Sequence, residues 1–431
     1  MAAVIAVAGL TACHSAPAAP RDPVVHALEQ AAHPLRSTDP GADPSDLRAL
    51  GDMVGEATVA GFGEATHGSH EFFTMKQRVL RYLVEEKGFT AFALELSWSA
   101  GLEIDDYLQT GKGDARTIAK DTLTGSPWDR EEFVDLIQWM RDYNSGHPGH
   151  TVHFVGDDIG APTLDDEFFG RITDYVRRNH PEALAKLDEL YTGLRPIDDA
   201  IAYMSDKPAA ERQRLAAQAQ QASDLITGLK GSGGAEFDRA EQNARNIAQT
   251  TEFLTVDTND QASLTTSERF RDQVMAQNVI WWQQHNGGKV MLSAHDGHAG
   301  YLAGDPATYP KTQGSFLHDA MGANYVAIGS TFDRGSFLSK DTALGGPWKK
   351  FTVGAAAPGS NEYTLNQVEY PDYYLDVRSA PAEARTWLDA ARPTRQIGTE
   401  FPVEPENVAL GRSFDVVVQL REVHEAEQRK P

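Results

Sequence analysis

Residues 58–68 read Thr-Val-Ala-Gly-Phe-Gly-Glu-Ala-Thr-His-Gly, an apolar run that passes directly into a polar segment flanked by glycines. The apolar half, residues 58–63, has the length and composition of a buried strand. A helix over residues 71–86 is predicted by apolar side chains spaced three or four apart, namely Phe72, Met75, Val79 and Leu83. Gly88 ends this helix. The stretch therefore predicts a strand, a polar turn and a helix.

The same alternation of short apolar strands and helices continues along the chain. Further strands are expected at residues 89–96, 151–156, 289–294 and 325–329, helices at 103–109 and 130–143, and late edge strands at 373–377 and 414–420. Short apolar strands that alternate with helices are typical of a parallel sheet covered on both faces. We therefore predict an α/β fold with a mostly parallel central sheet flanked by helices.

A long segment without strand patterns interrupts this alternation. Four helices are predicted within it, at residues 184–194, 209–229, 237–254 and 268–285. We interpret residues 161–286 as an all-helical insertion and expect it to form walls of a site at the strand ends. The remaining regions are a signal region at 1–20, a linker at 21–45 with a short helix at 24–31, and two core parts at 46–160 and 287–431.

The composition limits the classes of function. The chain has 431 residues, of which 41% are hydrophobic, which indicates a folded protein with a large core. Lysine and arginine total 39 against 62 aspartates and glutamates, a net charge of −23, so we expect no nucleic-acid partner. The single cysteine, Cys13, excludes an intramolecular disulfide and thiolate metal clusters.

The N-terminal residues have the pattern of an export signal. An apolar run at residues 2–9 is too short to span a bilayer and precedes Leu-Thr-Ala-Cys at residues 10–13, which resembles a bacterial lipobox. We therefore predict lipidation at Cys13 and an extracytoplasmic protein that contacts the membrane only through this anchor. Secretion without a lipid is the alternative.

Polar residues follow four of the predicted strands at the point where each strand ends. They are Glu64 and His67 after the first, Glu95 at the end of the second, Asp157 and Asp158 after the third, and His295 and His298 after the fourth. In open α/β sheets ligands bind beyond the carboxyl ends of the strands. We therefore expect these side chains to share one site.

Several chemistries lack their motifs. The chain contains no Gly-x-Ser-x-Gly, no Walker A loop and no His-Glu-x-x-His. A metal held by His67, His295 and a carboxylate stays open. We favour chemistry without a cofactor, in which His67 takes a proton from water while Glu64 or Glu95 orients its ring. His295 or His298 would then donate to a developing oxyanion, and Arg78 and Arg271 would supply positive charge.

The motifs resemble the erythromycin esterase family. The resemblance rests on residues 63–73 and 76–78, on Ala-Leu-Glu at 93–95, on Arg-Phe-Arg-Asp at 269–272 and on Ala-His-Asp-Gly-His at 294–298. It implies an α/β core with a helical insertion and an enzyme that opens the lactone ring of macrolides, as in antibiotic resistance. It also implies that His67 is the general base, that Glu64 is its partner, and that Glu95, His295 and His298 line the same site.

Our prediction is a hydrolase of this type acting on a small-molecule ester or macrolide, with His67, Glu64, His295 and Glu95 as catalytic residues. His298, Arg78, Arg271 and Asp158 are the predicted substrate-binding residues. One alternative is a haem- or metal-binding lipoprotein that uses His67 and His295. Another is a polyketide-tailoring enzyme that uses the same base without adding water.

Overall fold

The computed structural model of the chain describes residues 22–197, 199–229, 234–341 and 346–430. The predicted signal region and Cys13 lie outside these residues. The described residues form a nine-stranded sheet whose main path runs in the order β1 (Ala32–Pro34), β8 (Tyr373–Asp376), β11 (Val416–Val423), β6 (Tyr325–Ser339), β2 (Val59–Glu64), β5 (Lys289–His295), β3 (Phe89–Ser97) and β4 (His153–Asp158), with β7 (Lys349–Val353) paired to β6 off this path.

The sheet is mostly parallel, as predicted. All neighbours from β11 to β4 run parallel, whereas β1, β8 and β7 pair antiparallel with their partners. The five strands predicted from apolar runs are present, and β6 extends well beyond the expected residue 329. The two late strands are present as β8 and β11, but their predicted place at the edge is wrong, because both have neighbours on each side and β1 and β4 take the edges.

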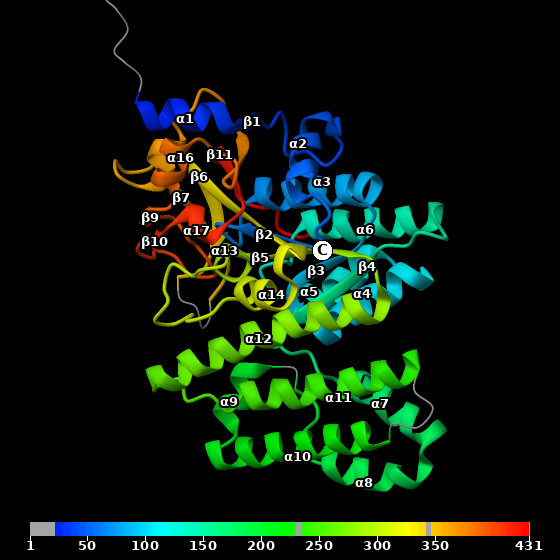
Figure 1. Ribbon diagram of the computed structural model, residues 1–431. Helices are drawn as coiled ribbons and strands as arrows, with labels where there is room; N and C mark the ends of the chain where they lie inside the picture. Colours follow the sequence, from blue (N-terminus) through cyan, green and yellow to red (C-terminus); the bar gives the residue numbers. More distant parts are fainter. Residues whose placement is uncertain (1–21, 198, 230–233, 342–345, 431) are drawn as a thin grey trace, which may run out of the picture.

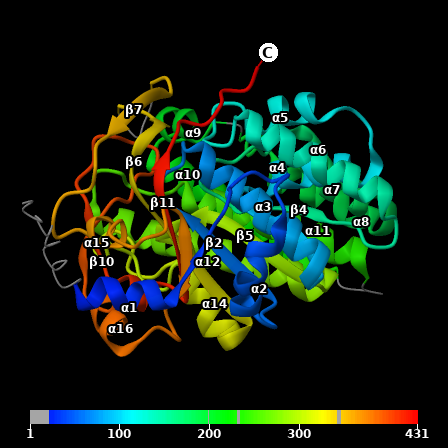
Figure 2. The same ribbon diagram turned by 90° about the horizontal axis from the view of Figure 1, so that it is seen from above.

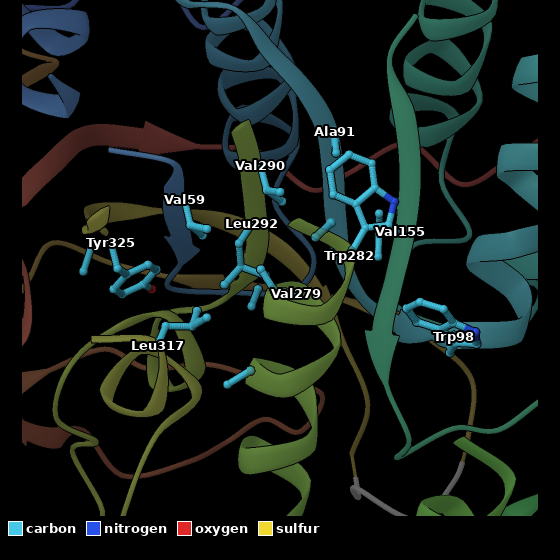
Figure 3. Packing of buried hydrophobic residues seen from close by; sticks show 14 of the residues in the cluster. Val59, Ala91, Trp98, Val155, Val279, Trp282, Val290, Leu292, Leu317 and Tyr325 are labelled. Atoms are coloured by element: carbon cyan, nitrogen blue, oxygen red, sulfur yellow. The ribbon is translucent and has the colours of Figure 1, made fainter. Parts of the chain in front are cut away.

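Successive strand residues feed two different cores because side chains alternate across a sheet. Val59 packs into the core beneath α12 (Gln261–Asn286) and α14 (Gln313–Met321), and its neighbour Ala60 packs into the opposite core. Figure 3 shows strand side chains, Val59 and Leu292 among them, pointing toward Val279 of α12 and Leu317 of α14. Each large aliphatic side chain buried in this way contributes about 1.5–3 kcal/mol.

Helices cover both faces of the sheet. On the Ala60 side lie α2 (Arg48–Val54), α3 (His70–Lys87) and α6 (Glu131–Gly146), with α4 (Trp98–Thr110) and α5 (Ala115–Leu123) toward the β4 edge. At the β1 edge, α1 (Pro23–Ala31) packs on α16 (Ala382–Leu388), and Figure 2 shows this pair at the end of the molecule away from α5 and α6. Short elements complete the core: α13 (Asp296–Ala299), α15 (Asn361–Leu365), α17 (Leu410–Ser413), β9 (Arg392–Thr394) and β10 (Glu406–Val408).

The helical insertion is present as predicted and stands off the sheet. Its helices are α7 (Asp166–Asn179), α8 (Pro181–Tyr191), α9 (Ala200–Asp206), α10 (Ala209–Gly228) and α11 (Ala235–Phe253), followed by α12. In Figure 1 α12 lies against the sheet, and α8 and α10 form the layer farthest from it. α12 therefore links the insertion to the strand ends.

Candidate active site

The turn after β2 holds His67 against Glu64. The Nδ1 atom of His67 lies 3.0 Å from Oε1 of Glu64, and the two residues are 7% and 0% exposed. Because a carboxylate can only accept, Nδ1 carries the hydrogen and Nε2 keeps a free lone pair. Burial lowers the pKa of His67 to about 4, although the charge of Glu95 opposes this. The ring is therefore neutral near pH 7 and able to take a proton.

A close approach of two backbones fixes this turn. The Leu338 N–H on β6 donates to the Gly68 carbonyl at 2.9 Å, and a Cβ on Gly68 would lie 2.0 Å from the Leu338 carbonyl oxygen. Only glycine fits at this position. On the other side, the His67 N–H donates to the carbonyl of Ile397 at 3.3 Å. The backbone of His67 and Gly68 is thus held between β6 and the segment around Ile397.

Lys76 lies behind Glu64, on the face of α3 that packs on the sheet. Its ammonium contacts Oε2 of Glu64 and donates to Ser293 Oγ at 3.1 Å and to the Ala294 carbonyl at 3.0 Å. Its side chain is 3% exposed, and burial lowers its pKa, whereas the contact with the Glu64 carboxylate favours the charged ammonium. We call Glu64, His67 and Lys76 the base side of the site.

His295 ends β5 and faces His67, with the ring centroids 5.0 Å apart. The N–H of Gly297 donates to Nδ1 of His295 at 3.1 Å, so in the neutral ring the hydrogen is on Nε2. Nε2 is buried and has no protein partner among the described residues. Burial and the nearby His67 hold the pKa of His295 well below its usual value. His295 therefore presents a donor where His67 presents an acceptor.

A network of charges occupies the other side of the site. Arg271 on α12 forms a two-pronged ion pair with Asp158, at 2.8 and 2.7 Å, and a third contact of 3.0 Å with Oε1 of Glu95. Oε2 of Glu95 accepts from the backbone N–H of His295 at 3.0 Å. Burial disfavours the charge on Glu95, but His298, His67 and Arg271 outweigh it and lower the pKa of this carboxyl.

His298 completes that network on α13. Its Nδ1 lies 2.8 Å from Oδ1 of Asp272, which also accepts from the Gln313 N–H, and its Nε2 lies 3.4 Å from Glu95. Burial opposes a charged ring, but Asp272 and Glu95 raise the pKa of His298 to about 9. The ring is protonated near pH 7. We call Glu95, Asp158, Arg271, Asp272 and His298 the charged side.

A cleft of about 600 Å³ opens onto six of these side chains, which are His67, Glu95, Asp158, Arg271, His295 and His298. Its walls come from the segments 125–128, 303–309 and 396–406 together with Ala161, Phe253 and Glu268 of the insertion. The expectation that the insertion forms the walls is therefore only partly correct, since three loops of the α/β core contribute more of them. The rings of Trp128 and His67 are perpendicular, with their centroids 5.1 Å apart. Nε1 of Trp128 donates to the Glu95 carbonyl at 2.9 Å.

Of the eight residues predicted as catalytic or substrate-binding, the structure brings seven together and leaves one out. Glu64 contacts His67 from behind, and the other six line the cleft: His67, Glu95, Asp158, Arg271, His295 and His298. Arg78 is 1% exposed and instead binds Asp46 and the carbonyl of Ser37, 2.6 Å away. Its prediction as a substrate-binding residue is wrong, because its guanidinium anchors the segment before α2 to α3.

Two residues of the site were missed, although the sequence carried a signal for each. Lys76 is four residues after Phe72 and three before Val79, so it belongs to the buried stripe of α3. Asp272 likewise shares a stripe with Met275 and Val279 of α12. A charged residue on an apolar stripe needs a buried partner, which makes it a candidate for a site.

Neither a metal-ligand cluster nor a membrane-spanning helix is found in the described ranges of the chain. No set of three or more His, Cys, Asp or Glu side chains is placed there to hold a metal ion. None of the helices in these ranges combines the length and the apolar composition that crossing a bilayer requires.

The comparisons with known proteins agree with the motifs. A family model described as erythromycin esterase matches residues 84–423. Erythromycin esterase type II from Escherichia coli is 22% identical over 421 residues, which are 90% of this chain and 94% of that protein. A solved protein from Bacillus cereus is 31% identical with a TM-score of 0.86, covering 94% of this chain and 98% of that one. A solved succinoglycan biosynthesis protein is 32% identical with a TM-score of 0.84, covering 94% and 97%.

Proposed function

The chain belongs to the erythromycin esterase family, and on that premise we propose that it hydrolyses a carboxylic ester or lactone with water activated by His67. The observation that carries the proposal is the pairing of two neutral histidines with opposite tautomers across the cleft. His67 offers a lone pair on Nε2, and His295 offers a hydrogen on its own Nε2. A base and an oxyanion donor are the two groups that addition of water to a carbonyl requires.

The first step is attack of water on the carbonyl carbon. His67 Nε2 takes one proton of the water, and the imidazolium that forms is stabilised by the Glu64 carboxylate 3.0 Å from Nδ1. A low pKa makes His67 a weak base in the resting enzyme. Its contact with a buried carboxylate strengthens it in the transition state, where the positive charge develops.

The carbonyl oxygen becomes an oxyanion in this step. His295 Nε2–H is buried without a protein partner, and such an orphan donor gains most when an anion forms beside it. Collapse of the tetrahedral intermediate then breaks the bond to the alkoxide. His298, with its pKa raised to about 9 chiefly by Asp272 and Glu95 against burial, supplies the proton that this leaving group needs. The products are an acid and an alcohol, and a lactone opens to a hydroxy acid.

The cleft favours a substrate with a bulky apolar body. A volume of about 600 Å³ is in the range of sites for drug-sized molecules. Besides the polar groups, its wall includes Leu96, Trp128, Phe253 and Val403. We propose a macrolide as the first substrate to test, because the Escherichia coli relative carries the name erythromycin esterase.

Mass spectrometry of the purified protein incubated with macrolides and simple esters tests the proposal. A product heavier by one water, formed equally in the presence of EDTA, supports lactone opening by the histidine base. Hydrolysis of simple esters alone supports the chemistry but contradicts the macrolide assignment. A product lighter by one water would indicate elimination by a tailoring enzyme, and no conversion of any compound would contradict the proposed reaction class.

We also propose that the chain is exported and anchored through Cys13. The support is the sequence Leu-Thr-Ala-Cys at residues 10–13. Labelling cells with a radioactive fatty acid tests this anchor. Label on the natural chain that is lost in Cys13→Ser supports it, and an unlabelled chain in the culture medium indicates secretion without a lipid.

A further inference from the structure

A buried lysine stands behind the base and takes no part in the steps described above. Lys76 projects from α3 into the space between the ends of β2 and β5. Its ammonium contacts Oε2 of Glu64, the oxygen that His67 does not use, and Oε2 has no other polar contact among the described residues. The two oxygens of one carboxylate are thus divided between a histidine and a lysine.

The other contacts of Lys76 hold the ammonium in place. It donates to Ser293 Oγ at 3.1 Å and to the Ala294 carbonyl at 3.0 Å, both on β5, and it lies 6.0 Å from the ring centroid of Phe62. An ammonium has three hydrogens to donate. Ser293 and Ala294 accept two of them, and the ion pair with Glu64 is the third polar contact of this nitrogen.

We propose that Lys76 is a positioning residue for His67, which it serves by fixing the Glu64 carboxylate and balancing its charge. This inference rests on the proposed role of His67 as the base. Lys76 lies on the far side of the carboxylate from the ring and does not line the cleft. It therefore acts on the reaction only through Glu64.

The physical reason is the charge on the carboxylate. A buried carboxylate with no cation beside it favours protonation of the adjacent imidazole. The free energy of a buried carboxylate–imidazolium pair is lower than that of a buried carboxylate without a counter-charge. His67 would then be held as an imidazolium and could not accept a proton from water. With Lys76 in contact, Glu64 is already compensated and the ring stays neutral.

The remaining charges around both groups act in known directions. Burial lowers the pKa of Lys76, and Asp296 and Glu95 raise it. The contact with Glu64 also favours the charged ammonium. Around His67, Glu95 favours the protonated ring, and His298 and Arg271 disfavour it. These groups belong to β3, α12 and α13 and stay unchanged in every variant below, so a change in His67 reports on the link through Glu64.

NMR titration of His67 tests the inference without any substrate. The full chain is labelled with 15N, and the His67 signals are assigned by their absence in His67→Gln. In Lys76→Met the titration midpoint of His67 is expected to rise by about one pH unit, which is about tenfold in proton affinity. In Lys76→Arg, which keeps the charge, the midpoint is expected to stay within about 0.3 units of the natural chain.

A double variant isolates the route through the carboxylate. Adding Lys76→Met to Glu64→Gln is expected to leave the His67 midpoint where Glu64→Gln alone puts it. A midpoint unchanged in Lys76→Met, or raised equally in the Glu64→Gln background, would overturn the inference. Lys76→Gln, which keeps a hydrogen-bond donor at the same place, replaces Lys76→Met in the same comparison if that variant does not fold.

The outcome is separable from that of the proposed function. A raised midpoint in a chain that hydrolyses no compound would keep the link between Lys76 and His67 and remove the esterase. An unchanged midpoint in a chain that hydrolyses esters would contradict the link between Lys76 and His67 and keep the proposed function. In an active chain, Lys76→Met is expected to move the acidic limb of kcat/KM upward with the midpoint, and Lys76→Arg is expected to restore it.

Discussion

The two sides of the cleft treat the same residue type in opposite ways. On the base side, His67 has one carboxylate neighbour that is already paired with Lys76, and burial lowers its pKa to about 4. On the charged side, His298 is also buried, yet Asp272 and Glu95 raise its pKa to about 9. Both residues are 7% exposed, so burial alone does not separate them.

The carboxylates that contact the two rings differ in their other partners, since Glu64 also contacts Lys76, whereas Asp272 also accepts the backbone N–H of Gln313. His298 has an aspartate on one nitrogen and a glutamate near the other, and together they outweigh the cost of burying a charge. Glu64 is shared with a cation, so it orients His67 without charging it. Two buried histidines can thus serve as an acid and a base at the same pH.

The largest loss of activity is expected when His67 is replaced. In His67→Gln we expect kcat/KM for the ester or lactone to fall by about 10²–10⁴-fold, the usual contribution of a general base. The fold should be retained, as checked by circular dichroism and thermal unfolding. His150→Gln, an exposed histidine in the loop before β4, is the matched control and should keep full activity. Normal turnover in His67→Gln would remove His67 from the mechanism.

The pH profile of the natural chain tests the proton states of His67 and His298 separately. Below a pH of about 4 His67 is protonated and cannot act as a base, so kcat/KM should fall about tenfold per unit there. Above a pH of about 9 His298 loses its proton and can no longer donate, so activity should fall again. A profile that rises continuously through pH 10 would contradict the role given to His298.

One negative charge of the charged side can be removed while both histidine side chains are kept. In Asp272→Asn the amide oxygen still accepts from His298 and from the Gln313 N–H, but the negative charge is gone. The alkaline limb of kcat/KM should move down by about 1–3 units, the usual effect of one adjacent charge. Asp174→Asn, at an exposed ion pair with Arg177, is the control. An unmoved limb in Asp272→Asn would mean that another group sets it.

The smallest effect on activity is expected at Arg78, which lies on α3 two residues from Lys76 but faces away from the site. Arg78→Met breaks a buried ion pair with Asp46 and should lower the free energy of unfolding by about 3–5 kcal/mol in urea titrations. Its kcat/KM should stay within about threefold of the natural value. A loss of activity as large as that of His67→Gln would return Arg78 to the site.

Much of this site could be predicted because parallel strands deliver their ends to one edge. The strands concerned show plainly in the sequence. His67 and His298 follow two of them, and the last residues of strands include Glu64, Asp158 and His295, with Glu95 two residues before the end of β3. The ion pair of Arg78 could not be predicted, because its partner Asp46 comes from a segment with no periodic pattern. The internal places of β8 and β11 were also hidden, since strand order depends on pairing and not on the pattern within a strand.

We infer that the two sides of the cleft hold their histidines in different proton states at the same pH. A 15N NMR spectrum of the natural chain at pH 7, with signals assigned by single His→Gln variants, tests it directly. We predict that His67 carries its hydrogen on Nδ1, that His295 carries its hydrogen on Nε2, and that His298 carries hydrogens on both nitrogens. Finding His67 and His298 in the same protonation state at that pH would contradict the account.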